Sequence, residues 1–296
     1  MECDRGNLQG SAGRPEMIWR EFSILLCLLW TGCGLIYENR YDTEHVTSYS
    51  NRNMDYLKEK SDFSEQVYRF YEVLFNEEPG HVTMLYDGED GEEASADVLG
   101  YYLSPFKIVK IFSTSMAPKM PEDEELIQKW LDEKEEKAEE LLHKVILHEL
   151  AHHFLVNKYP GLADRCWLNE GLAGLVEEGE IGIEKATFTF WNSSLILVAK
   201  AAKKRGYDIM GVLDMSWSEF HDDNERSADY AAGYIICYYI VTQWLPEEIR
   251  FDHKVDIIHG MGEDVVASLE DEIYAFLDKL VLVTEVKDET KNTGNP

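Results

Sequence analysis

Two histidines one helical turn apart, within an apolar stretch of the chain, constrain the fold more than any other feature of this sequence. Residues four apart on an α-helix differ by about 40° around its axis, so His148 and His152 present both imidazoles on one face. Apolar flanks indicate that this helix is buried: Val145, Ile146, Leu147, Leu150, Phe154 and Leu155. Buried imidazoles need polar partners, so another polar group is expected to reach this face.

A second amphipathic segment contains such a group. Glu170 follows His152 by eighteen residues, in a run with apolar residues at helical spacing, Leu168, Leu172, Leu175 and Val176. Pro160 and Gly161 break the chain between the two helices. The two histidines and Glu170 are therefore expected to bind one Zn2+ ion. Three protein ligands leave a coordination position open for water or substrate, which distinguishes a catalytic zinc site from a structural one.

Glu149 lies about 100° around the helix from His148, beside the metal rather than on it. From there it can polarise a zinc-bound water without occupying a coordination position. The competing interpretation is a surface helix with two solvated histidines. The apolar flanks and the second amphipathic segment both argue against it.

His-Glu-Leu-Ala-His followed by Trp-Leu-Asn-Glu-Gly-Leu-Ala resembles the gluzincin metallopeptidases, the peptidase-MA-like group that includes thermolysin and aminopeptidase N. The resemblance covers roughly residues 65 to 280, and its specific motifs lie between His148 and Tyr234. It implies a zincin-like catalytic domain that hydrolyses peptide bonds. It also implies His148, His152 and Glu170 as the ligands and Glu149 as general base and acid.

The resemblance further implies a downstream tyrosine that hydrogen-bonds the tetrahedral oxyanion. Tyr230 is the best match, and Tyr234, one turn further on the same face, is the second choice. A tyrosine in an apolar helix can instead serve only for packing. His221 is a weak candidate for a second oxyanion donor, and a surface histidine is the preferred interpretation.

Two departures from the family pattern affect what the chain is expected to do. The Gly-x-Met-Glu-Asn motif by which aminopeptidases bind a free amino terminus has no match between Tyr101 and Pro121. Endopeptidase or other amide hydrolysis is therefore favoured over a dedicated aminopeptidase. The carboxylate that braces a ligand histidine in thermolysin-like enzymes is replaced by Gly174. Glu177, seven residues after Glu170 and on the same helical face, either takes over that role or is simply solvated.

Length and charge set the remaining bounds. A chain of 296 residues fits one catalytic domain with appendages. Its net charge of −29 argues against binding to nucleic acid, whose phosphates it would repel, and favours cationic peptides at low salt. Acidic runs at residues 87–93 and 122–140 are expected to be solvated loop and helix faces. No sequence feature predicts an oligomeric state.

The amino terminus is typical of an export signal. A short apolar run, Phe22 to Trp30, follows Arg20 and ends at Thr-Gly-Cys33, which resembles the bacterial lipobox. Residues 1–33 are therefore predicted to be a lipoprotein-like signal peptide, with translation starting either at residue 1 or at Met17. Lipidation at Cys33 would anchor an exported protein in the cell envelope, periplasm or cell surface, and residues 34–60 are predicted to be a polar linker. An ordinary buried apolar segment is the alternative.

Two cysteines remain beyond the signal region, Cys166 and Cys237. They would be able to pair in an exported protein, but free, buried thiols are the preferred interpretation. The chain has no Cys-x-x-Cys pair, which excludes a zinc ribbon.

Strands precede helices along the chain, so an α+β fold is predicted, with a small mixed sheet followed by a mainly helical half in a domain of residues 61–285. By resemblance, residues 107–112 are the candidate for the edge strand that pairs with substrate. A plain sheet edge is the competing interpretation, and nothing in the sequence separates the two. Helices are predicted at 61–75, 121–143 running into the histidine helix, 170–203, 227–244 and 265–280; strands at 81–86, 98–103 and 107–112; a mixed segment at 208–224; and a flexible tail at 286–296.

The residues predict metal-assisted hydrolysis. Zinc lowers the pKa of its bound water towards about 7, and Glu149 accepts the proton as that water attacks the scissile carbonyl. The expected substrate is a peptide or protein. Two alternatives remain: an envelope lipoprotein that uses a gluzincin-like domain only to bind a partner, and a zinc hydrolase of non-peptide amides. The presence of Glu149 disfavours the first alternative, because a protein that had lost its catalytic activity would no longer need this residue.

Overall fold

The computed structural model describes residues 37–86, 100–111, 124–178, 180–181, 186–187, 190–221 and 225–281. The predicted signal peptide with Cys33, the acidic run 87–93 and the tail 286–296 lie outside the described residues. Within the described ranges, none of the helices combines the length and the apolar character needed to span a bilayer.

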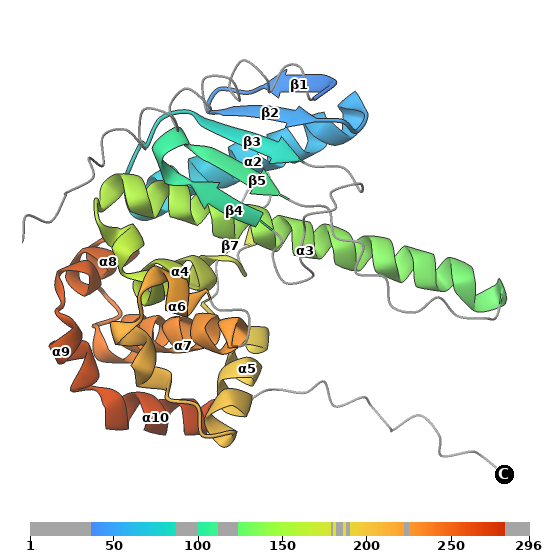
Figure 1. Ribbon diagram of the computed structural model, residues 1–296. Coiled ribbons are helices and arrows are strands. Elements are labelled where there is room, and N and C mark those ends of the chain that lie inside the picture. Colours follow the sequence, from blue (N-terminus) through green and yellow to red (C-terminus); the bar gives the residue numbers. More distant parts are fainter. Residues whose placement is uncertain are drawn as a thin grey trace, which may run out of the picture.

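A five-stranded sheet forms the upper layer of the molecule (Figure 1). The spatial order of its strands is β1 (Asn39–Asp42), β2 (Val46–Ser50), β3 (Val82–Tyr86), β5 (Ile108–Ile111) and β4 (Gly100–Leu103). The two outer pairs are antiparallel, while β3 runs parallel to both of its neighbours. The sheet is therefore mixed.

The prediction of a linker over residues 34–60 is wrong for its described part. Strands β1 and β2 lie there, and helix α2 (Met54–Phe75) begins seven residues before the predicted start at residue 61. Val46, Ser48 and Ser50 are fully buried on one face of β2. Serines occupy two of these inward positions, so the sequence lacks the alternation of apolar and polar residues from which a strand is predicted.

Helix α3 (Glu124–Lys158) runs unbroken; its C-terminal half lies between the sheet above and the helices that follow it in the chain below, and its N-terminal half extends beyond both (Figure 1). This confirms the prediction of a charged helix leading directly into the histidine helix. In its C-terminal half, α3 buries residues around much of its circumference, including Ile146, Leu150 and Phe154. The chain turns after it at Gly161, whose φ of 91° lies in the left-handed region that favours glycine.

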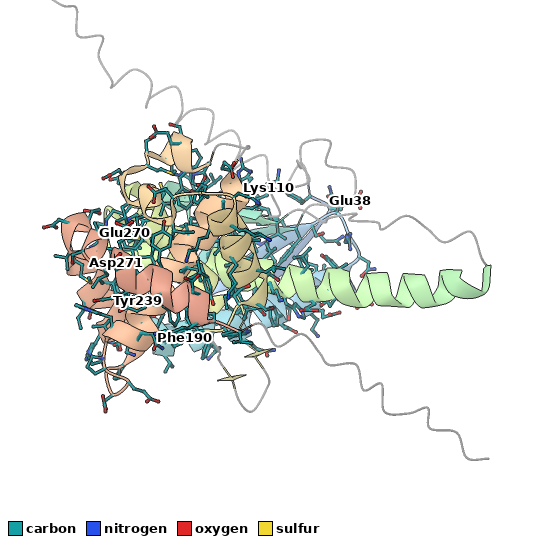
Figure 2. The ribbon with its side chains drawn as sticks, turned by 90° about the horizontal axis from the view of Figure 1, so that it is seen from below. Glu38, Lys110, Phe190, Tyr239, Glu270 and Asp271 are labelled. Atoms are coloured by element: carbon teal, nitrogen blue, oxygen red, sulfur yellow. The ribbon has the colours of Figure 1, made fainter. Side chains whose placement is uncertain are left out.

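The lower half of the molecule is mainly helical. It contains α4 (Cys166–Val176), α5 (Ser193–Lys204), α6 (Trp217–Phe220), α7 (Arg226–Tyr239), α8 (Phe251–Gly260), α9 (Glu263–Ala267) and α10 (Glu270–Lys279), with short turns η2 (Leu162–Asp164), η3 (Ile209–Asp214) and η4 (Ile240–Trp244). In Figure 2 the side chains of Tyr239, Glu270 and Asp271 mark this half, while Glu38 and Lys110 mark the side of the sheet.

Two helix predictions in this half were wrong in extent. The helix expected over 170–203 ends at Val176, and a small ribbon of β6 (Glu180–Ile181) and β7 (Ala186–Thr187) precedes α5. The closing helix expected over 265–280 is divided into α9 and α10. The helix predicted over 227–244 is confirmed as α7 and its continuation η4.

Helices α4 and α7 approach each other so closely that their backbones touch. A Cβ atom built on Gly171 would lie 2.4 Å from the carbonyl oxygen of Gly233, and one on Gly233 would lie 2.6 Å from the carbonyl oxygen of Trp167. Only glycine fits at either position without moving a helix. The contact fixes the spacing between Glu170 on α4 and Tyr230 on α7.

The fold is therefore mixed α+β, with a small mixed sheet and a mostly helical remainder, as predicted. One hydrophobic core runs from the sheet through α3 to the lower helices. Helix α3 lies at the centre of this core, and its His148 and His152 face Glu170 of α4 in the lower half.

Candidate metal centre

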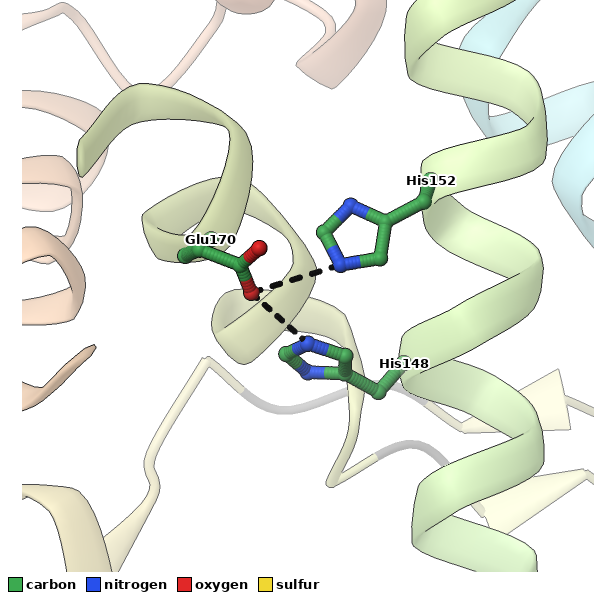
Figure 3. A group of neighbouring side chains, drawn as sticks. All are labelled: His148, His152 and Glu170. Carbon is green, nitrogen blue, oxygen red and sulfur yellow. Dashed lines mark hydrogen bonds and ion pairs between the residues drawn. The ribbon is translucent and has the colours of Figure 1, made fainter. Parts of the chain in front are cut away.

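His148, His152 and Glu170 converge at the contact between α3 and α4 (Figure 3). Oε2 of Glu170 lies 3.1 Å from Nε2 of His148 and 3.3 Å from Nε2 of His152. The side chains of all three are largely buried, with exposed fractions of 14%, 10% and 7% for His148, Glu170 and His152. The structure thus brings together the three ligands predicted from the sequence.

These distances fit a metal ion. Zinc binds imidazole nitrogen and carboxylate oxygen at about 2.0–2.2 Å, and tetrahedral geometry then separates two ligand atoms by roughly 3.3–3.5 Å. The observed separations of 3.1 and 3.3 Å are close to this range. Within the described ranges, no other histidine, cysteine or carboxylate joins this group of three ligand atoms. A zinc ion held here would therefore keep a position for water or substrate.

Both histidines are braced through their second ring nitrogen. Nδ1 of His148 donates to Oε2 of Glu177 over 2.9 Å, and Asn192 donates to the other oxygen of Glu177. Nδ1 of His152 donates to Oδ1 of Asn169 over 3.1 Å. With Nδ1 donating in this way, the neutral form of each ring would direct an Nε2 lone pair toward the position that a metal ion would take. The bracing role predicted for Glu177 is confirmed, and the solvated alternative is wrong.

Sequence reasoning missed Asn169 and Asn192 as members of this network. Asn169 directly precedes Glu170 on α4, so its position in the chain was a usable signal. Asn192 caps the start of α5, where its own side chain accepts from the backbone N–H of Leu195. Its link to Glu177 depends on the β6–β7 ribbon folding back, which no local pattern encodes.

The charges of the centre depend on one another. Burial alone would raise the pKa of Glu170, but His152 and His148 hold it well below its usual value. Burial likewise would lower the pKa of His148, but Glu170 and Glu177 raise it well above the usual value. A divalent cation replaces these protons with a fixed positive charge between the same groups.

Glu149 lies beside the ligands, buried against the sheet. Strand β4 passes directly over it, and a Cβ atom on Gly100 would lie 3.0 Å from its Cγ and 3.1 Å from its Oε1. Burial raises the pKa of the Glu149 carboxyl, while His152 and His148 partly oppose this. Such a carboxylate is poised to accept a proton. Gly100 gives the carboxylate its space, a role that sequence reasoning missed.

The structure separates the two candidate tyrosines. The ring centroid of Tyr230 lies 6.4 Å from that of His148 at an interplanar angle of 25°, so it borders the centre. Burial and then the charges of Glu170 and Glu149 raise the Tyr230 pKa well above its usual value, which keeps the hydroxyl protonated. Tyr234 is fully buried, and its hydroxyl donates to the carbonyl of Phe190 and accepts from the N–H of Asn192. Tyr234 is a packing residue.

His221 faces the centre rather than the surface. Its Nε2 lies 3.8 Å from Oε1 of Glu170, and its side chain is 15% exposed. Nδ1 donates to the carbonyl of Trp217 over 2.8 Å, and the indole of Trp217 stacks on the imidazole with centroids 4.1 Å apart. The prediction of a surface histidine was wrong, because α6 turns this face of the chain toward α4.

The edge strand was wrongly assigned. Strand β5, at Ile108–Ile111, is paired on both sides, with β3 and with β4. Strand β4, at Gly100–Leu103, is the edge and lies beside α3. The chain reverses through a short turn, η1 (Ser104–Phe106), so the later strand takes the inner position parallel to β3. The order of β4 and β5 along the chain therefore differs from their order in the sheet.

A third histidine, His153, joins the centre to its surroundings. Its Nε2 donates to the carbonyl of Gly80 over 3.0 Å, and its Nδ1 accepts from the hydroxyl of Tyr102 on β4 over 3.0 Å. Burial is the main reason that its pKa is lowered to about 4, so the ring is neutral. His153 thus holds the edge strand and the segment before β3 against α3.

The two cysteines of the domain are both free and buried, as preferred. Cys166 begins α4, and Cys237 lies where the backbones of α4 and α7 meet, with its Sγ 2.7 Å from a Cβ atom built on Gly171. Burial raises the pKa of the Cys166 thiol to about 11 and that of Cys237 further. Both are protonated, inert packing residues at neutral pH.

The geometry of the centre is the basis for any assignment, because similarity offers none. No protein-family model matches the chain, and no curated protein matches it.

Proposed function

We propose that this protein is a zinc-dependent metallopeptidase of the gluzincin type, with a zincin-like catalytic domain. His148, His152 and Glu170 hold one Zn2+ ion. One observation carries the proposal: Oε2 of Glu170 on α4 lies 3.1 Å from Nε2 of His148 and 3.3 Å from Nε2 of His152 on α3, and both histidines are hydrogen-bonded through Nδ1. A structural zinc site, whose coordination positions are all filled by protein ligands, would not require a buried carboxylate such as Glu149 beside an open coordination position.

The residues around the metal divide the chemistry of hydrolysis among them. A zinc ion held by His148, His152 and Glu170 would supply Lewis-acid chemistry: polarisation of the scissile carbonyl and a more nucleophilic water at neutral pH. Glu149 accepts a proton from the attacking water and returns it to the leaving amine, a role that suits its raised pKa. Tyr230, kept protonated, donates a hydrogen bond to the developing oxyanion.

The position of β4 at an edge of the sheet supports a peptide as the substrate. Among the described strands β4 pairs with β5 alone, and an extended peptide can add to such an edge as a further strand. The strand passes Glu149 at Gly100, so an extended peptide paired there would run past the general base. A small non-peptide amide would gain nothing from that edge.

The proposed enzyme is exported and lipid-anchored through Cys33. The apolar run from Phe22 to Trp30 and the following Thr-Gly-Cys support this part of the proposal. Metabolic labelling with a fatty acid should mark the wild-type chain and leave Cys33→Ala unmarked. Equal labelling of both chains would contradict the anchor.

Peptide cleavage tests the proposed activity directly. The zinc-loaded chain is incubated with a diverse peptide pool, and the cleavage sites are mapped by mass spectrometry. Glu149→Gln is the matched control, because it removes the base and leaves the ligands: it should retain the zinc content of the wild type and lose cleavage by several orders of magnitude, about 10³-fold or more. Full activity in a zinc-replete Glu149→Gln protein would refute the assigned base. Absence of cleavage by the wild type would favour a partner-binding role.

A further inference from the structure

A second group of potential metal ligands lies at the opposite end of the sheet from β4. His45 is in the turn between β1 and β2, Glu72 is in the last turn of α2, and Glu78 is in the segment that follows this helix. One ligand atom from each lies within 4.8 Å of the other two. None of these residues takes part in the candidate metal centre.

The imidazole of His45 is held in a defined orientation. Its ring stacks on Tyr68 with centroids 4.4 Å apart and an interplanar angle of 10°. Its Nδ1 lies 2.8 Å from Oε1 of Glu65. That carboxylate also accepts from the hydroxyl of Thr43, the backbone N–H of His45 and the guanidinium of Arg69. Four donors keep Glu65 ionised, so Nδ1 of His45 carries the proton that it donates.

The other nitrogen of His45 faces two more carboxylates. Nε2 lies 3.7 Å from Oε1 of Glu72, beyond hydrogen-bond distance. Two atoms bound to one zinc ion at about 2.0–2.2 Å are separated by roughly 3.3–3.5 Å. The distance between Nε2 and Oε1 is closer to that separation than to the length of a hydrogen bond. A lone pair on Nε2 would repel the oxygen of Glu72 unless a cation lay between them.

Few basic side chains lie within ion-pair distance of these two carboxylates in the described structure. His45 is the one basic side chain within ion-pair distance of Glu72, and none lies within that distance of Glu78 in the described ranges. The neighbouring carboxylates of Glu44 and Glu65 do have a basic partner, because Arg69 forms an ion pair with each of them. Glu72 and Glu78 thus form a site of high negative potential beside an oriented imidazole.

We propose that His45, Glu72 and Glu78 form a second metal site for a divalent transition-metal ion such as Zn2+. Imidazole nitrogen is a poor ligand for Ca2+ and Mg2+, which prefer oxygen, and a good one for Zn2+. Glu65 acts as the carboxylate that orients the ligand histidine, the arrangement common around protein-bound zinc. Site residues come from three segments, so the ion ties the β1–β2 turn to the end of α2.

The proposed site also adjoins the segment before β3 that is hydrogen-bonded to α3. Glu78 is followed by Pro79 and Gly80, and the carbonyl of Gly80 accepts hydrogen bonds from Tyr68 and from His153. The backbone N–H of Val82 donates to the carbonyl of His45 over 2.9 Å. An ion at this site would therefore stabilise the fold, and its loss should lower the melting temperature without removing a catalytic group.

Zinc stoichiometry in the full chain tests the proposal. In His148→Ala, which lacks a ligand of the candidate metal centre, equilibrium dialysis should still find one bound zinc. Adding Glu78→Gln should weaken that binding at least about tenfold and abolish the rise in melting temperature on zinc addition. Glu78 is exposed, so this change should not unfold the chain, and Glu77→Gln is the matched control with unchanged binding.

Equal zinc binding by His148→Ala with and without Glu78→Gln would overturn the proposal. So would a His148→Ala chain that binds no zinc. This test is independent of the proposed peptidase. Failure of the peptidase proposal would appear instead as wild-type zinc binding that His148→Ala leaves unchanged.

Discussion

Replacing Gly171 with alanine should force α4 away from α7 and carry Glu170 with it. The new Cβ atom would lie 2.4 Å from the carbonyl oxygen of Gly233, whereas ordinary contact begins at 3.4 Å, so the backbones must separate by about 1 Å. Overpacking of a core costs about 1–3 kcal/mol, and we expect the upper end, since a backbone carbonyl cannot rotate away as a side chain does.

Gly174→Ala is the matched control on the same helix. Its Cβ atom would lie 3.1 Å from Cδ1 of Leu195, the end of a flexible side chain. Both substitutions gain the same helix propensity, about 1 kcal/mol, so their difference isolates the close approach. Urea unfolding should show Gly171→Ala to be less stable than Gly174→Ala by about 3 kcal/mol. Zinc affinity should fall only in Gly171→Ala. Equal midpoints and equal affinities would refute the argument that this contact positions Glu170.

Three further predictions concern the centre and its support. Glu177→Gln should weaken zinc binding about 10- to 100-fold in a competition titration, because it removes the carboxylate that orients His148, whereas Glu178→Gln, whose partner is Lys144, should not. Tyr230→Phe should lower kcat about 10²-fold with zinc content unchanged, since one oxyanion donor is lost, and a variant with full kcat would exclude that role. Lowering the pH should destabilise the fold through His153: its pKa falls from 6.5 to about 4 on folding, so its contribution is complete above pH 6.5 and is lost as the pH falls toward 4, by about 3 kcal/mol in total. Urea midpoints measured between pH 7 and pH 4 should show this decline, and His153→Gln should flatten it.

The arrangement of the candidate ligands was predictable because its signals are local. A spacing of four residues places His148 and His152 on one face of any helix, and a spacing of seven returns Glu177 to the face of Glu170. Helical periodicity of apolar residues was likewise sufficient to identify α3 and α7.

What escaped prediction depends on contacts between distant segments. Strands β1 and β2 have polar residues at inward positions, where pairing with β3 rather than composition makes them strands. The order of β4 and β5 depends on which one pairs with β3, and neither sequence favours one choice. His221 and Asn192 reach the centre only because α6 and the β6–β7 ribbon fold back toward α4.

The glycine contact between α4 and α7 has a mechanical consequence. Since the two backbones touch, α4 and α7 are expected to move together and to keep the separation of Glu170 and Tyr230 constant. His148 and His152 belong to a different helix, α3, which is connected to α4 through the short turn η2. Motion of α3 relative to α4 would therefore change the distances from Glu170 to the two histidines. A metal ion bound by all three side chains would restrict that motion.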